Sequence, residues 1–256
     1  MVTDTSVAAE ANASSIPEFA INPQLSIGSL ADRFASFGRV QIEDFLAPDC
    51  AIALRRHLES SDQWLHLFNV EEQSVQVPSD DWDAMPKANR SKVSRIIEDA
   101  AAFGFQYQYD SIRALDNLRD RARSKRLLDR FAQFMTSRPV LDLMTSISGS
   151  DDLNFADCQA TRYRPGDFLT PHDDELEGMH RRLAYVLSLT SDWQPRWGGL
   201  LHFTDGRGGI EQTFPPRFNA LCLFAIGQSH FVSQVASYTP MPRISATGWI
   251  RTQAPA

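Results

Sequence analysis

The second half of the chain carries a repeating pattern of short apolar runs in which hydrophobic and polar residues alternate. Turn residues separate these runs, which read FADCQATRYR, LAYVLSLT, GLLHFTD, FNALCLFA, HFVSQVA and RISATGWIR. Alternation places successive side chains on opposite faces of a strand. Several such strands at short spacing predict an antiparallel sandwich or barrel. We therefore expect a β core over residues 151–251.

The first half has a mixed pattern in which helical spacing outnumbers strand-like alternation. The spacing predicts helices over residues 29–38, 47–60, about 87–102 and 115–135. Strand-like runs lie at residues 39–46, in WLHLFNV and in SVQVP, and a loop is expected from Ser79 to Pro86. The aromatic run FQYQY follows the third helix.

The two halves are expected to form one unit, because amphipathic helices need a sheet face to bury against. We expect a single α+β domain over residues 26–256, with helical support up to about residue 150. The first 25 residues are small and polar, with no basic n-region or apolar h-region of a signal peptide. We expect residues 1–25 to be a lead-in without fixed structure.

Composition narrows the classes of protein that the chain can belong to. With 43% hydrophobic and 22% charged residues, it resembles an ordinary soluble globular protein. No apolar run approaches the roughly 20 residues that span a bilayer, so we expect no membrane association. The net charge of −7 disfavours nucleic-acid binding, which needs a basic face. The arginines and lysine of residues 119–130 are interpreted as a solvated helix face.

Three widely spaced cysteines, Cys50, Cys158 and Cys222, lie in apolar settings without a CxxC pair. This arrangement favours buried free thiols in a reducing compartment over a disulfide framework. We therefore expect a cytoplasmic protein.

The segment YRPGDFLTPHDDELEG, residues 163–178, concentrates side chains that bind metal ions. Residues i and i+2 of a strand share a face, so His172 and Asp174 can converge on one ion. A second strand histidine, His230, lies 58 residues downstream in GQSHFVSQV, far enough for the chain to return to a neighbouring strand. Two imidazoles and one carboxylate on one side of an ion are diagnostic of non-haem Fe(II) oxygenases.

The last strand, RISATGWIR, adds a candidate anion site. Alternation puts Arg243, Ser245, Thr247 and Trp249 on one face. An arginine that points into a β core is costly unless it meets a buried anion, and its guanidinium fits a carboxylate bidentately. Trp249, further along this face, would form an apolar wall.

Taken together, HDDELEG, RRLAYVLSL, WGGLLHF and RISATGWIR resemble the 2-oxoglutarate- and Fe(II)-dependent oxygenases of the prolyl 4-hydroxylase type, in particular the catalytic domain of ribosomal prolyl hydroxylases. The resemblance is dense from about Tyr163 to Arg251. It implies a double-stranded β-helix, or jelly-roll, core with N-terminal supporting helices. It also implies hydroxylation of a C–H bond of a prolyl residue in a protein or peptide, with succinate and CO2 as co-products.

The resemblance further implies a role for each matching residue. His172, Asp174 and His230 would hold Fe(II), and Trp249 would line the substrate pocket. Arg243 and Tyr163 would bind the distal carboxylate of 2-oxoglutarate, with Ser245 nearby. Ser188 stands where these relatives have a second co-substrate tyrosine, so a hydroxyl remains but with shorter reach. The cofactors would be Fe(II), 2-oxoglutarate and O2, with ascorbate as a candidate reductant.

Two other functions stay open at this stage. The first is an oxygenase of a free amino acid or another small metabolite, and the second is a non-redox metal-binding jelly-roll domain. Other candidate groups receive a structural interpretation: Asp173 and Glu175 as turn residues, His202 as an ordinary strand histidine, DGRGG as a hairpin turn, and Trp193 with Trp197 as packing residues. His57, His66 and His180 are expected to have no functional partners.

Overall fold

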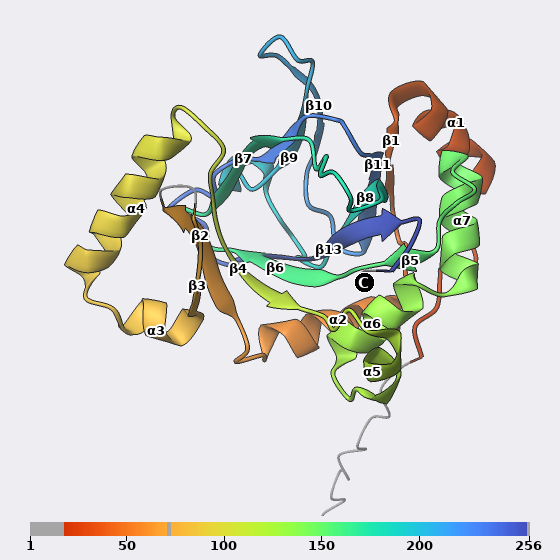
Figure 1. Cartoon of the computed structure of the whole chain (residues 1–256), viewed down its shortest axis with the longest axis horizontal. Coiled ribbons are helices and arrows are strands. Elements are labelled where there is room, and N and C mark those ends of the chain that lie inside the picture. Colours follow the sequence, from red (N-terminus) through yellow and green to blue (C-terminus); the bar gives the residue numbers. More distant parts are fainter. Residues whose placement is uncertain (1–17, 71–72, 255–256) are drawn as a thin grey trace, which may run out of the picture.

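The computed structural model describes residues 18–70 and 73–254, and over these residues the chain folds around one strongly curved antiparallel sheet (Figure 1). Its strand order is β1-β11-β8-β13-β6-β4-β7-β12-β9-β10, with β2 paired to β3 and β4, and β5 paired to β13. The strands are β1 (Arg39–Ile42), β2 (Leu65–Val70), β3 (Gln73–Pro78), β4 (Tyr107–Arg113), β5 (Phe155–Ala156), β6 (Gln159–Tyr163), β7 (Phe168–His172), β8 (Arg181–Ser188), β9 (Leu201–Thr204), β10 (Ile210–Phe214), β11 (Ala220–Ala225), β12 (His230–Val232) and β13 (Arg243–Arg251).

Helices cover the outside of the sheet, with α3 and α4 on one side and the remaining α-helices on the other (Figure 1). They are α1 (Ile27–Phe37), α2 (Pro48–Glu59), α3 (Ser79–Ala84), α4 (Lys87–Ala101), α5 (Leu118–Arg123), α6 (Leu127–Met135) and α7 (Arg138–Ser148), with a 3-10 turn η1 (Pro195–Trp197). The first-half strands β1, β2, β3 and β4 belong to the same sheet as the later strands. The expected division into a helical half and a β half is therefore too sharp.

Alternation along the central strands separates two apolar clusters. On β13, Ile244, Ala246 and Ile250 pack in the cluster beneath the helices, together with Phe131 and Met135 of α6. The opposite face of the sheet contributes a second cluster, which includes Tyr163, Phe203 and Phe224, with Trp249 packed against it. The predicted alternation of RISATGWIR is thus confirmed, and it leaves Arg243 and Trp249 on the inner face of the curved sheet.

Three helix predictions in the first half were wrong. Residues 79–84, expected as loop, form α3, because Trp82 is buried against Phe68 with ring centres 5.3 Å apart. The helix expected over 115–135 breaks into α5 and α6, since the buried carboxylate of Asp129 accepts from Ser124 Oγ (2.6 Å) and Leu115 N (2.9 Å). Helix α7 was not predicted, although its apolar residues recur at helical spacing up to Gly149.

Residues 18–25 of the lead-in expected over residues 1–25 are ordered, contrary to that prediction. Residues 1–17 lie outside the described residues. Ile21 forms a bridge with Leu46, and the ring of Phe19 lies 5.4 Å from that of Phe131. Apolar burial therefore fixes the chain from residue 18. The three cysteines are free and buried. Within the described ranges, none of the helices has the length and hydropathy of a membrane span.

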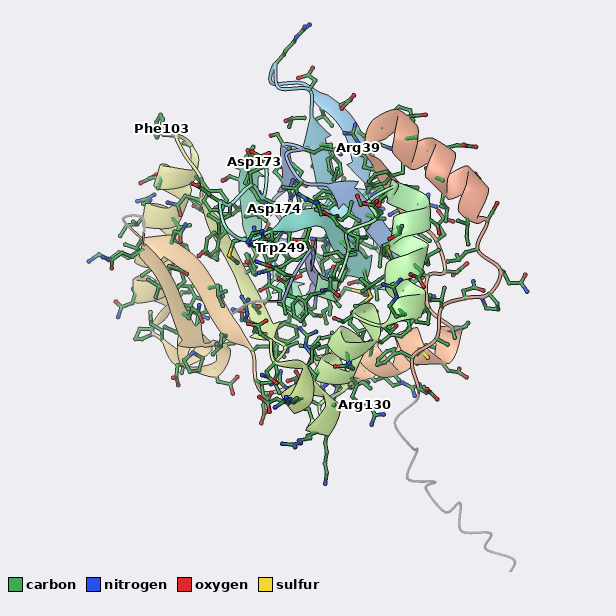
Figure 2. All side chains as sticks on the ribbon, turned by 45° about the vertical axis from the view of Figure 1, so that its right-hand side comes forward. Arg39, Phe103, Arg130, Asp173, Asp174 and Trp249 are labelled. Carbon is green, nitrogen blue, oxygen red and sulfur yellow. The ribbon has the colours of Figure 1, made fainter. Side chains whose placement is uncertain are left out.

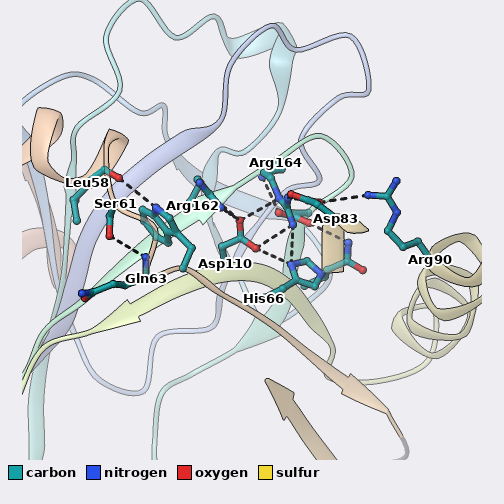
Figure 3. Close-up of polar contacts among 12 residues, drawn as sticks. Leu58, Ser61, Gln63, His66, Asp83, Arg90, Asp110, Arg162 and Arg164 are labelled. Carbon is teal, nitrogen blue, oxygen red and sulfur yellow. Dashed lines mark hydrogen bonds and ion pairs between the residues drawn. The ribbon is translucent and has the colours of Figure 1, made fainter. Parts of the chain in front are cut away.

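A buried charge network holds β2, β4 and β6 together (Figure 3). Fully buried Asp110 accepts hydrogen bonds from His66 Nδ1 (2.8 Å), Arg162 Nε (2.8 Å) and Arg164 Nη2 (3.1 Å). Burial alone would raise the pKa of Asp110, but the bond from His66 and the two arginines hold it below its usual value. His66, expected to lack partners, is therefore a structural residue. Arg164 also binds Asp83, which ties α3 to the turn after β6.

One arginine of the predicted solvated face is also structural. Arg121 is buried, and its Nη1 donates to the carbonyl oxygens of Ala132 (3.1 Å) and Ala156 (2.9 Å). It joins α6 to β5. Its neighbours Arg119, Arg123 and Arg130 are exposed, as expected.

Candidate metal centre and its cavity

His172, Asp174 and His230 come together on the inner face of the sheet. His172 ends β7 and is the direct register partner of His230 on the antiparallel strand β12. Asp174 lies just past the end of β7 in a left-handed conformation (φ 64°), which turns its carboxylate back toward both imidazoles. One ligand atom from each residue lies within 4.8 Å of the others. The strand that carries His230 therefore does lie beside the strand that carries His172, as expected.

Backbone carbonyls fix the orientation of both rings. Nδ1 of His172 lies 3.0 Å from the carbonyl oxygen of Thr170, and Nδ1 of His230 lies 2.8 Å from that of Gln228. A carbonyl only accepts, so each Nδ1 carries the proton and each Nε2 is left with a free lone pair. Each Nε2 lies 3.5 Å from a different oxygen of Asp174.

Electrostatics also favour a metal-binding state of these residues. Burial, together with the nearby His172, lowers the pKa of His230 to about 4. The imidazole is therefore neutral at neutral pH and available as a ligand. Two imidazoles and one carboxylate on one side of a common point fit the donor set of a non-haem Fe(II) site. Among the described residues this is the only cluster of at least three such groups.

The triad opens into a cavity of about 220 Å³, in which the inner face of β13 forms one wall. Arg243 lies in this wall, is 3% exposed, and makes no hydrogen bond or ion pair with any described residue. Burial lowers the pKa of its guanidinium. The cavity thus contains a buried cation without a counter-ion, which is the arrangement expected of an anion site.

Tyr163 faces Arg243 across the ladder between β6 and β13. The guanidinium carbon of Arg243 lies 5.2 Å from the centre of the Tyr163 ring. Burial raises the pKa of Tyr163, so its hydroxyl stays protonated and can donate. Gly199 lets the arginine stem lie this close, because a Cβ there would be 3.3 Å from Arg243 Cδ at a positive φ. Arg243 and Tyr163 are therefore brought together as expected.

Ser188 and Ser245 lie deeper. They are register partners on β8 and β13, and both hydroxyls are buried without a hydrogen-bond partner among the described residues. Neither serine lines the cavity. Ala184 and Val186, on the same face of β8 as Ser188, do reach it. The short side chain of Ser188 therefore does not reach the cavity, which a longer side chain at this position would enter.

Trp249 lines the cavity, and its neighbour Arg181 was missed by the sequence analysis. The guanidinium carbon of Arg181 lies 3.6 Å from the ring centre of Trp249, and its Nη1 donates to the carbonyl oxygen of Asp174 (3.0 Å). Nε of Arg181 and Nε1 of Trp249 are both buried without an acceptor among the described residues. Two donors beside the triad therefore lack an acceptor.

An aromatic row on and before β4 was not predicted from the sequence. Phe105, Tyr107 and Tyr109 all line the cavity. The ring of Tyr109 stacks on that of Tyr163 at 5.1 Å, and the ring of Phe105 lies 5.6 Å from that of His172. The signal was the period of two in FQYQY, which puts all three rings on one face.

The structural interpretations of the other candidates are confirmed. His202 binds Thr213 Oγ1 through Nδ1 (2.8 Å) and Ser233 Oγ through Nε2 (3.2 Å), away from the triad. Asp205 of DGRGG accepts from two backbone amides in the turn between β9 and β10. Asp173 accepts from the backbone of Glu175. The rings of Trp193 and Trp197 pack edge to face at 5.4 Å.

The chain is similar to known proteins in both sequence and structure. Residues 158–251 match the family described as the 2OG-Fe(II) oxygenase superfamily. The prolyl 3-hydroxylase OGFOD1 of Mus musculus is 33% identical over 113 residues, which are 41% of this chain and 20% of that relative. Matches to further vertebrate and insect prolyl 3-hydroxylases likewise span only 28% and 25% of their lengths.

Two solved structures share the fold. A prolyl-4-hydroxylase of Pseudomonas putida superposes with a TM-score of 0.55 at 20% identity, covering 89% of this chain and 100% of the other. A prolyl hydroxylase of Trichoplax adhaerens, in complex with a hypoxia inducible factor oxygen degradation domain peptide fragment, gives 0.59 at 14% identity, covering 88% and 89%. These similarities confirm the expected double-stranded β-helix.

Proposed function

We propose that the chain is a 2-oxoglutarate- and Fe(II)-dependent oxygenase that hydroxylates a prolyl residue of a protein or peptide, because residues 158–251 match that superfamily and the similar curated relatives are prolyl 3-hydroxylases. The observation that carries this proposal is one cavity that contains both the His172–Asp174–His230 triad and the unpaired guanidinium of Arg243. A non-redox metal-binding domain has no use for such a cation beside its metal ligands.

The residues divide into those for the metal and those for the co-substrate. His172, Asp174 and His230 would hold Fe(II). Arg243 pairs with the distal carboxylate of 2-oxoglutarate, and the protonated hydroxyl of Tyr163 donates to the same group. When bound, these cofactors and O2 supply an oxidation that converts 2-oxoglutarate to succinate and CO2 and transfers one oxygen atom to a substrate C–H bond.

Tyr109 is assigned a supporting role toward the co-substrate. It stacks on Tyr163 and lines the cavity that Ser188 does not reach. Burial raises the pKa of its hydroxyl, which therefore stays a donor. Tyr109, from β4, thus supplies a tyrosine hydroxyl in place of the one that the resembling enzymes carry at the position of Ser188 on β8.

The cavity favours a peptide over a free amino acid. A free amino acid brings a carboxylate and an ammonium group, and each needs a buried partner. Among the described residues that line the cavity, Asp174 is the only carboxylate and Arg243 the only guanidinium or ammonium group, and both are committed to the cofactors. A peptide brings neutral carbonyls, which suit the indole N–H of Trp249, a cavity-lining donor without an acceptor among the described residues.

Coupled turnover tests this function. The protein is incubated with Fe(II), 2-oxoglutarate and blocked proline-containing peptides, or with free L-proline, and succinate is compared with the mass gain of one oxygen atom. We expect equal amounts of succinate and hydroxylated peptide, with NMR of the product giving the hydroxylated carbon. His172→Ala should abolish turnover while His202→Ala retains it. Coupled turnover of free proline alone would contradict the proposal.

We further propose a reducing, cytoplasmic setting, with ascorbate as the reductant. Burial raises the pKa of Cys158 and of Cys222 to about 12, so both thiols stay protonated and unreactive, which suits such a compartment. Ascorbate should prolong repeated turnover without changing the initial rate. A fluorescent fusion of the full chain found outside the cytoplasm would contradict the location.

A further inference from the structure

Two exposed phenylalanines stand where the chain passes from α4 to β4, next to the metal triad. Phe103 is 95% exposed and Phe105 is 50% exposed. Figure 2 shows Phe103 standing out from the molecule beyond the end of α4. Large apolar side chains held in water at the entrance of a cavity mark a surface that a partner covers.

Hydrogen bonds fix this segment to the strand that carries the triad. The backbone amide of Gln106 donates to Thr170 Oγ1 (2.7 Å), and the amide of Thr170 donates to the carbonyl oxygen of Gln106 (2.9 Å). Thr170 lies two residues before His172. The ring of Phe105 consequently sits against the ring of His172, with centres 5.6 Å apart. The ring of Phe105 and the triad therefore form one continuous wall.

The spacing along this wall suits an extended substrate. Ring centres are 5.8 Å apart between Phe105 and Tyr107, and 5.5 Å apart between Tyr107 and Tyr109. Two residues of a strand-like extended segment advance by about 6.6 Å and place both side chains on one face, so side chains two positions apart in such a segment match the rings. Tyr107 is held in place by its hydroxyl, which donates to Ser74 Oγ (2.8 Å).

The inner and outer parts of the row have different surroundings. Tyr109 is half-buried, stacks on Tyr163 and belongs to the co-substrate side, whereas Phe105 and Phe103 face solvent. The outer part carries no ionisable side chain except the Tyr107 phenol. Aromatic-lined grooves of this kind dock proline-rich extended segments. A carboxylate placed on the same rings would lose water without gaining a partner.

We propose that Phe103, Phe105 and Tyr107 form a docking wall for an extended substrate segment that carries a second proline or a large aliphatic residue two positions from the hydroxylated proline. This inference rests on the proposed function and specifies its substrate class. Phe105 and Phe103 then determine which sequences bind, while the triad and Arg243 determine the chemistry.

Peptide binding under anaerobic conditions tests the wall without turnover. The probes are fluorescein-labelled nonapeptides of glycine with a central proline, and leucine, serine or aspartate two positions away on both sides. A fourth peptide has a central alanine flanked by leucine. Dissociation constants are measured by anisotropy with Fe(II) and 2-oxoglutarate present, for the wild type, Phe103→Ser, Phe105→Ser and the control Phe37→Ser. Phe37 is an exposed phenylalanine at the end of α1.

We expect the wild type and Phe37→Ser to bind the leucine peptide about tenfold more tightly than the serine peptide, and the aspartate peptide most weakly. Phe103→Ser and Phe105→Ser should each reduce that preference about threefold to fivefold. Because Phe103 is exposed, its variant should melt at the wild-type temperature.

Two results would overturn the inference in distinguishable ways. If all proline-centred peptides bind equally and more tightly than the alanine-centred one, or if both phenylalanine variants keep the leucine preference, the wall is wrong and the proposed function stands. If no peptide binds while free L-proline is hydroxylated, both are wrong.

Discussion

Arg243 and Tyr163 face each other across β13 and β6, with the guanidinium carbon 5.2 Å from the ring centre, and the arginine has no acid partner among the described residues. A buried cation with only an aromatic ring beside it is costly for the folded protein. The cost is understandable if the cavity is built for an anion that arrives from solution. This relationship therefore links the stability of the protein to its co-substrate.

The first prediction concerns that stability. Arg243→Met removes the uncompensated charge and keeps an apolar stem in the wall, so the variant without co-substrate should melt about 2 to 8 °C above the wild type. Saturating 2-oxoglutarate with a divalent metal should raise the melting temperature of the wild type but not that of the variant. Thermal unfolding by circular dichroism measures both. A variant that melts lower without co-substrate would refute the argument.

The second prediction separates two hydroxyls. Tyr109→Phe should weaken 2-oxoglutarate binding about threefold to tenfold, because one hydrogen bond to a charged group is lost. Ser188→Ala should change the dissociation constant less than about twofold, since this serine does not line the cavity. Absorbance titration of the anaerobic Fe(II) protein gives both constants. If Ser188→Ala raised the dissociation constant more than Tyr109→Phe, the co-substrate hydroxyl would be that of Ser188 on β8.

The third prediction uses two neighbouring arginines. Arg181→Met removes the guanidinium that stacks on the cavity-lining Trp249 and should raise the KM for a peptide about tenfold. Arg182→Met is the matched control, because Arg182 is exposed and paired with Asp152 (2.7 Å). Steady-state kinetics at saturating 2-oxoglutarate distinguish the two. Equal KM values would mean that Arg181 only supports the loop of Asp174.

The fourth prediction concerns pH. Burial raises the pKa of Asp167 to about 7, above its unfolded value of about 4. The folded protein therefore holds a proton that the unfolded chain has lost, and this contribution to stability disappears as pH rises from 4 to 7.

The variant Asp167→Asn should not lose stability in this way as pH rises, because its amide cannot ionise. Its free energy of unfolding relative to the wild type should rise by about 2 to 4 kcal/mol between pH 4 and pH 8. Gln108, which donates to Asp167 (3.0 Å), can turn its amide to accept from the new asparagine. Denaturant unfolding across this range measures the difference. A constant difference would mean that Asp167 is ionised throughout.

Much of the site was predictable because its signals are local. His172 and Asp174 lie two residues apart, and alternation alone put Arg243 and Trp249 on one face of β13. The return of His230 to His172 needed only that β12 pair with β7 in an antiparallel core. These inferences depend on strand geometry that varies little from one protein to another.

The parts that escaped prediction depend on contacts between distant segments. Tyr109 lies more than fifty residues before the HDD motif, and nothing in FQYQY indicates that β4 would insert between β6 and β7. Arg181 is one of two adjacent arginines, and only the fold shows which one stacks on Trp249. His66 gained its role from Asp110 and Arg164, whose pairing requires the assembled sheet.

The most direct test of the central claim is an anaerobic titration of the metal-free protein with Fe(II) and then 2-oxoglutarate, followed by the visible charge-transfer absorbance of the chelate. The wild type should develop this band, and Arg243→Met should need about a hundredfold more 2-oxoglutarate to do so. Iron binding without any band in the wild type would contradict the account, since Arg243 would then not be a co-substrate anchor.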